Sequence, residues 1–165
     1  VVSALIAGAA LYYLQIYAYY DEVKLEVEDV QLTSIFTGEP EPIMFENFKA
    51  IDSDSSPLRF RACFETGLSF GLLTETYGVY YEAEPLVPPG WFDCFGAEQG
   101  GSELESGVAV AFMGIENFSY GIDRVIAVYP DGRAYAWHQI NACGEVVFDG
   151  QRPPETCPPV PERLQ

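Results

Sequence analysis

The chain has 165 residues, with 25 acidic side chains against 8 basic ones, a net charge of −17 and 48% hydrophobic residues. Disordered chains combine high charge with low hydrophobicity, so this composition excludes simple disorder. Nucleic-acid binding depends on Lys and Arg side chains that neutralise phosphates, which this chain largely lacks. We therefore expect a folded protein without a nucleic-acid partner.

The first twenty residues contain no charged side chain. A helix of this length spans ~30 Å, the thickness of the hydrocarbon layer of a bilayer. A cleaved signal peptide would end in a small-x-small site, and the exit at Tyr17–Asp21 does not have one. A buried soluble helix would usually show a polar face, whereas this segment offers only Ser3 and Gln15. Residues 1–21 are therefore predicted to form a single transmembrane anchor in the lipid bilayer.

Tyrosines gather toward the end of this segment, as in the aromatic belt at a membrane surface. The five residues are Tyr12, Tyr13, Tyr17, Tyr19 and Tyr20.

Small residues near the start of the segment could let another membrane helix approach closely. Ala4 and Gly8 have small-xxx-small spacing, and Ser3 and Ala7 stand one residue earlier. This spacing typifies helix–helix contacts, but Ala and Gly are also common in membrane helices that have no such partner. Both readings remain open.

Residues 22–165 hold 24 acidic and 8 basic side chains, so this second domain carries a charge of −16. It is long enough for one hydrophobic core. The acidic flank after the anchor fits a domain on the outer side of the membrane. An acidic surface there could attract a basic soluble cytochrome, or it could be an adaptation to a saline habitat.

The four cysteines are an even number, widely spaced and without a C-x-x-C pair. Zinc sites usually contain a close pair of ligands, so two disulfides in an oxidising compartment are favoured over a metal site. Of three possible connectivities we favour Cys63–Cys94 and Cys143–Cys157, the latter clipping the proline-rich tail at 151–165. Four free thiols in a cytosolic domain are the alternative.

Alternating apolar and polar residues predict several strands. Residues 23–32 suggest a strand leaving the membrane, 37–42 a turn, and 42–51 a further strand. After the loop at 52–57, residues 58–64 alternate again. The residues expected on one face of that strand are Leu58, Phe60, Ala62 and Phe64.

Two short helices are predicted between the strands. Thr66 would open the first, over residues 67–77. Its apolar side would consist of Leu68, Leu72 and Leu73. The second would start at Ser102, because Glu105 follows at the capping-box spacing.

The last third predicts a buried strand at 107–115 and a hairpin at 124–140 whose turn is Asp131–Gly132. A short strand would follow at 145–148, and then the extended tail. These elements predict an α+β fold with a mainly antiparallel sheet and one or two short helices.

The residues show no catalytic motif, so we expect neither an enzyme nor a bound metal or cofactor. His138 is the only histidine and lies in a predicted strand, away from any recognisable nucleophile. Asp52–Ser55 resembles the start of a calcium loop but lacks the later ligands of that motif. The aromatic run 77–95 is either core or a surface that offers Trp91 and Phe92 to a partner.

Several phrases resemble an uncharacterised family of small single-pass inner-membrane proteins from alphaproteobacteria related to the purple bacteria. The phrases are YYLQIYAYYDEV (12–23), AIDSDSSPLRFRACF (50–64), LLTETY (72–77), PGWFDCF (89–95) and YGIDRVIAVYPDGRAYAWHQINACGE (120–145). The resemblance implies a bacterial inner-membrane protein with its C-terminal domain in the periplasm, and it implies no activity.

Together these features predict a non-catalytic accessory subunit of an inner-membrane respiratory or photosynthetic complex. Other integral membrane subunits would bind the anchor, and the acidic domain would help to dock a basic electron carrier. One alternative is a stand-alone envelope assembly factor. Another is a periplasmic ligand sensor or cryptic hydrolase, which a deep pocket of convergent polar groups around His138 would favour.

Overall fold

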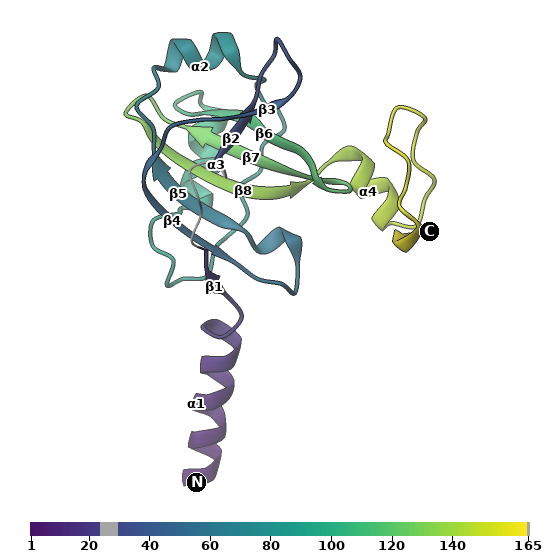
Figure 1. Cartoon of the computed structure of the whole chain (residues 1–165). Helices are drawn as coiled ribbons and strands as arrows, with labels where there is room; N and C mark the ends of the chain where they lie inside the picture. Colours follow the sequence, from purple (N-terminus) through teal and green to yellow (C-terminus); the bar gives the residue numbers. More distant parts are fainter. Residues whose placement is uncertain (24–29, 165) are drawn as a thin grey trace.

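The computed structural model describes residues 1–23 and 30–164, which form a helix and an α+β domain. Helix α1 (Val2–Ile16) stands away from the domain like a stem, with the N-terminus at its far end (Figure 1). The domain is built on one six-stranded sheet.

All neighbouring strands of this sheet are antiparallel, in the order β1-β4-β5-β8-β7-β6. Their bounds are β1 Asp21–Glu22, β4 Glu46–Asp52, β5 Arg61–Glu65, β6 Val110–Ser119, β7 Ile122–Val128 and β8 Arg133–Ile140. The α+β prediction with a mainly antiparallel sheet is confirmed.

The remaining elements cover the sheet or extend it. A two-stranded hairpin pairs β2 (Gln31–Thr33) with β3 (Pro40–Pro42). Three short α-helices lie in the described part of the domain, one more than the maximum predicted: α2 Phe70–Thr76, α3 Ala97–Glu105 and α4 Ala142–Phe148. Two 3-10 turns are η1 (Pro57–Arg59) and η2 (Glu162–Leu164).

Both faces of the sheet are apolar and both are covered, because successive side chains of a strand point to opposite faces. On one face, strand residues pack with the β2–β3 hairpin and α2, in a cluster that includes Leu32, Ala62, Leu73, Phe112 and Ile126. On the other, they pack with the irregular segment 78–96 and α3, in a cluster that includes Cys63, Phe92, Phe95, Val125 and Trp137. All seven residues of β7 are consequently buried.

The predicted hairpin is confirmed as β7–β8. Ile126 pairs with Ala136, and Gly132 at the turn has a φ of +91°, a conformation that favours glycine. The strand predicted at 58–64 begins three residues later, because Leu58 lies in η1. Its alternation is confirmed for Phe60, Ala62 and Phe64, which share one cluster.

The helix predicted at 67–77 exists but begins later than expected. Ser69, not Thr66, caps α2 by accepting a hydrogen bond from the backbone N–H of Leu72. Leu73 is buried, whereas Leu72 is 49% exposed, so the predicted apolar side is only partly correct.

The helix predicted to begin at Ser102 is wrong in its boundary, since α3 ends at Glu105. Glu103 instead accepts a hydrogen bond from the Tyr129 hydroxyl at 2.6 Å.

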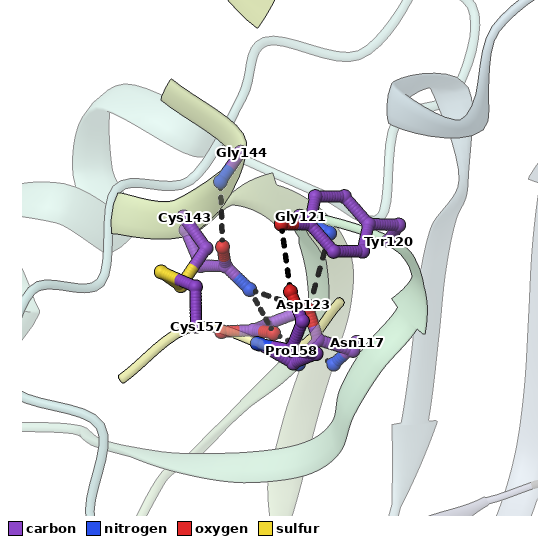
Figure 2. The surroundings of a disulfide bond; sticks show 9 residues. Asn117, Tyr120, Gly121, Asp123, Cys143, Gly144, Cys157 and Pro158 are labelled. Atoms are coloured by element: carbon purple, nitrogen blue, oxygen red, sulfur yellow. Dashed lines mark hydrogen bonds between the residues drawn. A yellow bond between two sulfur atoms is a disulfide. The ribbon is translucent and has the colours of Figure 1, made fainter. Parts of the chain in front are cut away.

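The strand predicted at 145–148 is wrong, because these residues belong to α4. Asn141 caps this helix through a bond from the Gly144 N–H at 3.0 Å, while its side-chain amide donates to Asp123 at 2.8 Å. Figure 2 shows Gly144 and Asp123, the two partners of this side chain, beside the Cys143–Cys157 disulfide. Local capping therefore outweighs the strand preference of Val146 and Val147.

At the N-terminal side of the domain, most of the strand predicted at 23–32 (residues 24–29) lies outside the described residues. The turn predicted at 37–42 is shorter than expected, because residues 40–42 pair with β2 as strand β3. This edge strand accommodates two prolines, which lack the N–H of a central strand.

The favoured disulfide pairing is confirmed. Cys63–Cys94 ties β5 to segment 78–96, and Cys143–Cys157 ties α4 to the C-terminal tail. The tail is held further by a bond from the Tyr120 hydroxyl to the Pro158 carbonyl at 3.2 Å. Disulfides persist in oxidising compartments, so they point to an exported domain.

The predicted transmembrane helix is not supported. Helix α1 has 15 residues, a length of only ~22 Å at the rise of an α-helix, and the chain turns after Ile16. Across residues 1–23 and 30–164, no helix combines the length and the apolar character needed to cross a bilayer.

Gly144 tests the attachment of α4. A Cβ at this position would overlap the Gly121 carbonyl (Figure 2), so Gly144→Ala is expected to lower the free energy of unfolding by about 2 kcal/mol. Gly71→Ala is the matched control, because a Cβ there meets nothing and Ala favours the helix by about 0.5–1 kcal/mol. Urea unfolding of both variants measures the difference, and equal stabilities would contradict the close packing of Gly121 on Gly144.

Candidate functional site: an apolar helix and its aromatic collar

Helix α1 is the most unusual surface of the molecule. It contains no acidic or basic residue, and none of its residues is buried. Its large apolar side chains, Leu5, Ile6, Leu11 and Leu14, are each more than half exposed. Water-exposed apolar area costs about 25 cal/mol per Å², so such a helix favours an apolar environment.

Trp91 fixes the end of this helix to the domain. Its indole N–H donates to the carbonyl oxygen of Ile16 at 2.7 Å, which satisfies one of the carbonyls left unpaired at a helix C-terminus. Its ring also stacks on Tyr17, with centroids 5.9 Å apart.

Two further tyrosines and an arginine complete the junction. The Tyr20 ring meets Trp91 edge-on at 5.9 Å, and the Arg59 guanidinium lies 5.0 Å from the Tyr19 ring centre and 5.7 Å from that of Tyr20. We call this group, Tyr17, Tyr19, Tyr20, Arg59 and Trp91, the aromatic collar.

The collar combines features that suit a boundary between water and an apolar phase. Trp and Tyr rings are apolar with one polar atom, and they favour such boundaries. Arg59 adds a positive charge beside the rings of Tyr19 and Tyr20. The helix and collar can therefore bind an apolar phase with an anionic surface, although the arrangement contains no group suited to bond-breaking chemistry.

The predicted belt residues all lie on or beside α1. Tyr12 and Tyr13 are exposed on the helix, and Tyr13 stacks on Tyr17 at 5.7 Å. Tyr17, Tyr19 and Tyr20 belong to the collar. The predicted helix-packing residues Ser3, Ala4, Ala7 and Gly8 are all exposed, and a Cβ at Gly8 would meet nothing within 4 Å.

The two alternatives for the aromatic run 77–95, core and partner surface, apply differently to Phe92 and Trp91. Phe92 is only 8% exposed and packs in the second core cluster. Trp91 is partly exposed, but its indole N–H is occupied by Ile16. Sequence reasoning missed Arg59, because nothing in its local pattern places it beside tyrosines forty residues earlier.

His138 is enclosed rather than presented to solvent. It is 1% exposed and stacks between Phe60 and Phe118, at centroid distances of 4.8 and 4.4 Å. One ring nitrogen pairs with the Pro57 carbonyl at 2.5 Å, and Nε2 accepts from Arg124 Nε at 3.0 Å. Both nitrogens are therefore engaged in structural hydrogen bonds.

An open hollow of about 440 Å³ reaches His138 from the surface. Its polar lining includes Asp52, Ser53, Asp54 and Ser119. The Asp52 carboxylate accepts the Ser53 N–H at 2.8 Å. Within the described residues no group of three His, Cys, Asp or Glu side chains could hold a metal ion.

Trp91→Phe tests the link between α1 and the domain. The substitution keeps an aromatic ring but removes the hydrogen bond to Ile16, which contributes about 1 kcal/mol. We expect amide exchange at residues 13–18 to accelerate about fivefold while the melting temperature of the domain stays the same. Unchanged exchange at these amides would contradict the anchoring role of the indole N–H.

His138 predicts a pH-dependent stability. Burial, helped by the charge of Arg124, lowers the pKa of His138 to about 4 from an ordinary value of 6.5. The unfolded chain therefore binds more protons between these values, so stability is full above about pH 6.5 and falls by up to ~3 kcal/mol toward pH 4. We expect His138→Gln to have a flatter profile in this window, measured by urea unfolding at several pH values; an unchanged slope would show that other groups cause the loss.

The family of unknown function DUF6446 matches residues 30–158. The match begins after α1 and β1. It covers the other five strands of the six-stranded sheet, α2, α3, α4 and both disulfides. No curated protein and no solved structure matches the chain. The expectation of an uncharacterised family is confirmed: the chain belongs to the family of unknown function DUF6446.

Proposed function

We propose that this protein is a non-catalytic accessory subunit of an inner-membrane, energy-transducing complex, respiratory or photosynthetic. In this proposal α1 attaches the chain to the membrane and to an integral membrane subunit. The acidic domain lies in the periplasm, where it helps to dock a basic electron carrier.

The observation that carries the proposal is the exposure of α1. An uncharged helix with exposed leucines and isoleucine is costly in water and favourable in lipid or against another apolar helix. The collar at its domain end supports the same orientation, since its Trp and Tyr rings and Arg59 match the headgroup region of a bilayer.

The location of the domain is supported by its two disulfides. All four cysteines are paired, as is usual for domains exported to an oxidising compartment such as the periplasm. The acidic character of the domain supports the docking role, because opposite charge raises the association rate of a partner.

The attachment is tested by placing a charge on α1. Leu11→Arg is expected to release a large part of the chain from isolated membranes into the soluble fraction, because a buried arginine opposes insertion by about 2.5–3.5 kcal/mol. Tyr81→Arg adds the same charge at an exposed position of the domain and is expected to leave the fractionation unchanged. Equal fractionation of the two variants would contradict attachment through α1.

Gentle extraction and co-purification test the subunit role, with variants at two small residues of α1. Gly8→Leu is expected to keep the chain in the membrane but to lower the yield of the co-purifying membrane subunit about tenfold, because close helix approach is lost. Ala10→Leu, on the opposite side of the helix, is the control. A wild-type chain that purifies alone in mild detergent would contradict the subunit role.

A further inference from the structure

The β2–β3 turn and α2 lie at the end of the domain opposite α1 (Figure 1), and they carry a second exposed apolar surface. It consists of Ile35 and Phe36 in the β2–β3 turn and Leu72 on α2, with exposed fractions of 55%, 78% and 49%. We call these three residues the distal patch. They lie outside the two core clusters, so the fold itself gives no reason for their apolar character.

The turn and α2 are held together. The Ile35 N–H donates to the Thr76 carbonyl at 2.9 Å, and Ser34 forms a β-bridge with Tyr77. Leu73 and Tyr77 are buried beneath and fix α2 to the sheet. The distal patch is therefore presented by two supported elements, and it can be recognised without prior ordering.

The rim of the patch is acidic. Glu39 and Glu75 are exposed and Glu41 is partly exposed, while residues 30–42 and 67–78 contain no Lys or Arg. Glu41 is held by a bond from the Thr37 hydroxyl at 3.1 Å. Burial is the main cause of a raised pKa of Tyr77, the residue that follows α2, and the negative charge of Glu41 raises this pKa further.

We propose that the distal patch is the docking surface for a small soluble protein whose own apolar contact area is ringed by Lys and Arg. Protein–protein interfaces usually have apolar contacts at the centre and oppositely charged groups at the rim. An anionic lipid surface would be repelled by the rim, and a second copy would place Glu against Glu. The inference rests on the proposed function for the arrival of a basic partner from the side away from the membrane.

The test uses the full chain in lipid nanodiscs and a basic mitochondrial-type cytochrome c as the probe. The same probe with succinylated lysines, which reverses its charge, is expected not to bind. Glu39→Lys combined with Glu75→Lys is expected to weaken binding about tenfold at low salt and to reduce its salt dependence. Phe36→Ser is expected to weaken binding about fivefold or more with little change in salt dependence.

Matched variants separate the distal patch from the general acidity of the domain. Glu98→Lys combined with Glu155→Lys changes the net charge equally at exposed positions elsewhere, and Val87→Ser removes another exposed apolar side chain. Both are expected to bind like the wild type within about twofold. Ile35→Ser serves as a second patch variant, and circular dichroism verifies that each variant is folded.

Three results would overturn the proposal. The first is that the Glu39/Glu75 and Glu98/Glu155 double variants weaken binding of the probe equally. The second is that the chain binds neither the native nor the succinylated cytochrome, or binds both. The third is that the chain associates with itself and that Phe36→Ser abolishes this association. Failure of the proposed function has a different signature, since loss of membrane attachment or of the co-purifying subunit changes neither the affinity for the probe nor its dependence on the distal patch.

Discussion

The domain depends on one constraint, which is that residues 125–128 of β7 contribute apolar side chains to both faces of the sheet. Strand β7 is buried along its whole length, so neither side of the sheet can face water. One side is covered by regular elements, the β2–β3 hairpin and α2. The other is covered largely by segment 78–96, which is rich in prolines and aromatics and makes little regular secondary structure. An irregular cover loses much conformational entropy on folding, and the Cys63–Cys94 disulfide reduces that cost by joining it to β5.

Elements that follow from local sequence patterns could be predicted, whereas those that depend on tertiary contacts could not. Alternation at Phe60, Ala62 and Phe64 and the Asp131–Gly132 turn are local patterns, and both were predicted correctly. The strand predicted at 145–148 is wrong because Asn141 caps a helix there. Asp123 on strand β7 orients the Asn141 side chain, and this long-range contact is not visible in the local sequence pattern. Arg59 was missed in the candidate site for a similar reason. Its contact with Tyr19 follows from the position of η1, a tertiary relation that no local pattern contains.

Composition alone does not predict where α1 ends or which aromatic residues of the candidate site are buried. The charge-free segment predicted a transmembrane helix over residues 1–21, but α1 ends at Ile16, and Tyr17, Tyr19 and Tyr20 join the collar instead of extending the helix. Phe92 and Trp91 are adjacent in sequence and have different roles, one in the core and one at the junction. Helix α1 lies at one end of the acidic domain, and the β2–β3 turn and α2, which carry the distal patch, lie at the other (Figure 1).

The fluorescence of the two tryptophans reports on two different parts of the molecule. Trp137 has no exposed surface and lies in the second core cluster, so its emission reports on the integrity of the fold. Trp91 lies at the junction with α1, between two tyrosine rings, so its emission responds to the surroundings of the helix. Because the chain has only these two indoles, replacing either one leaves a single intrinsic fluorophore. A change in the surroundings of α1 and unfolding of the domain thus become separately visible without an added dye.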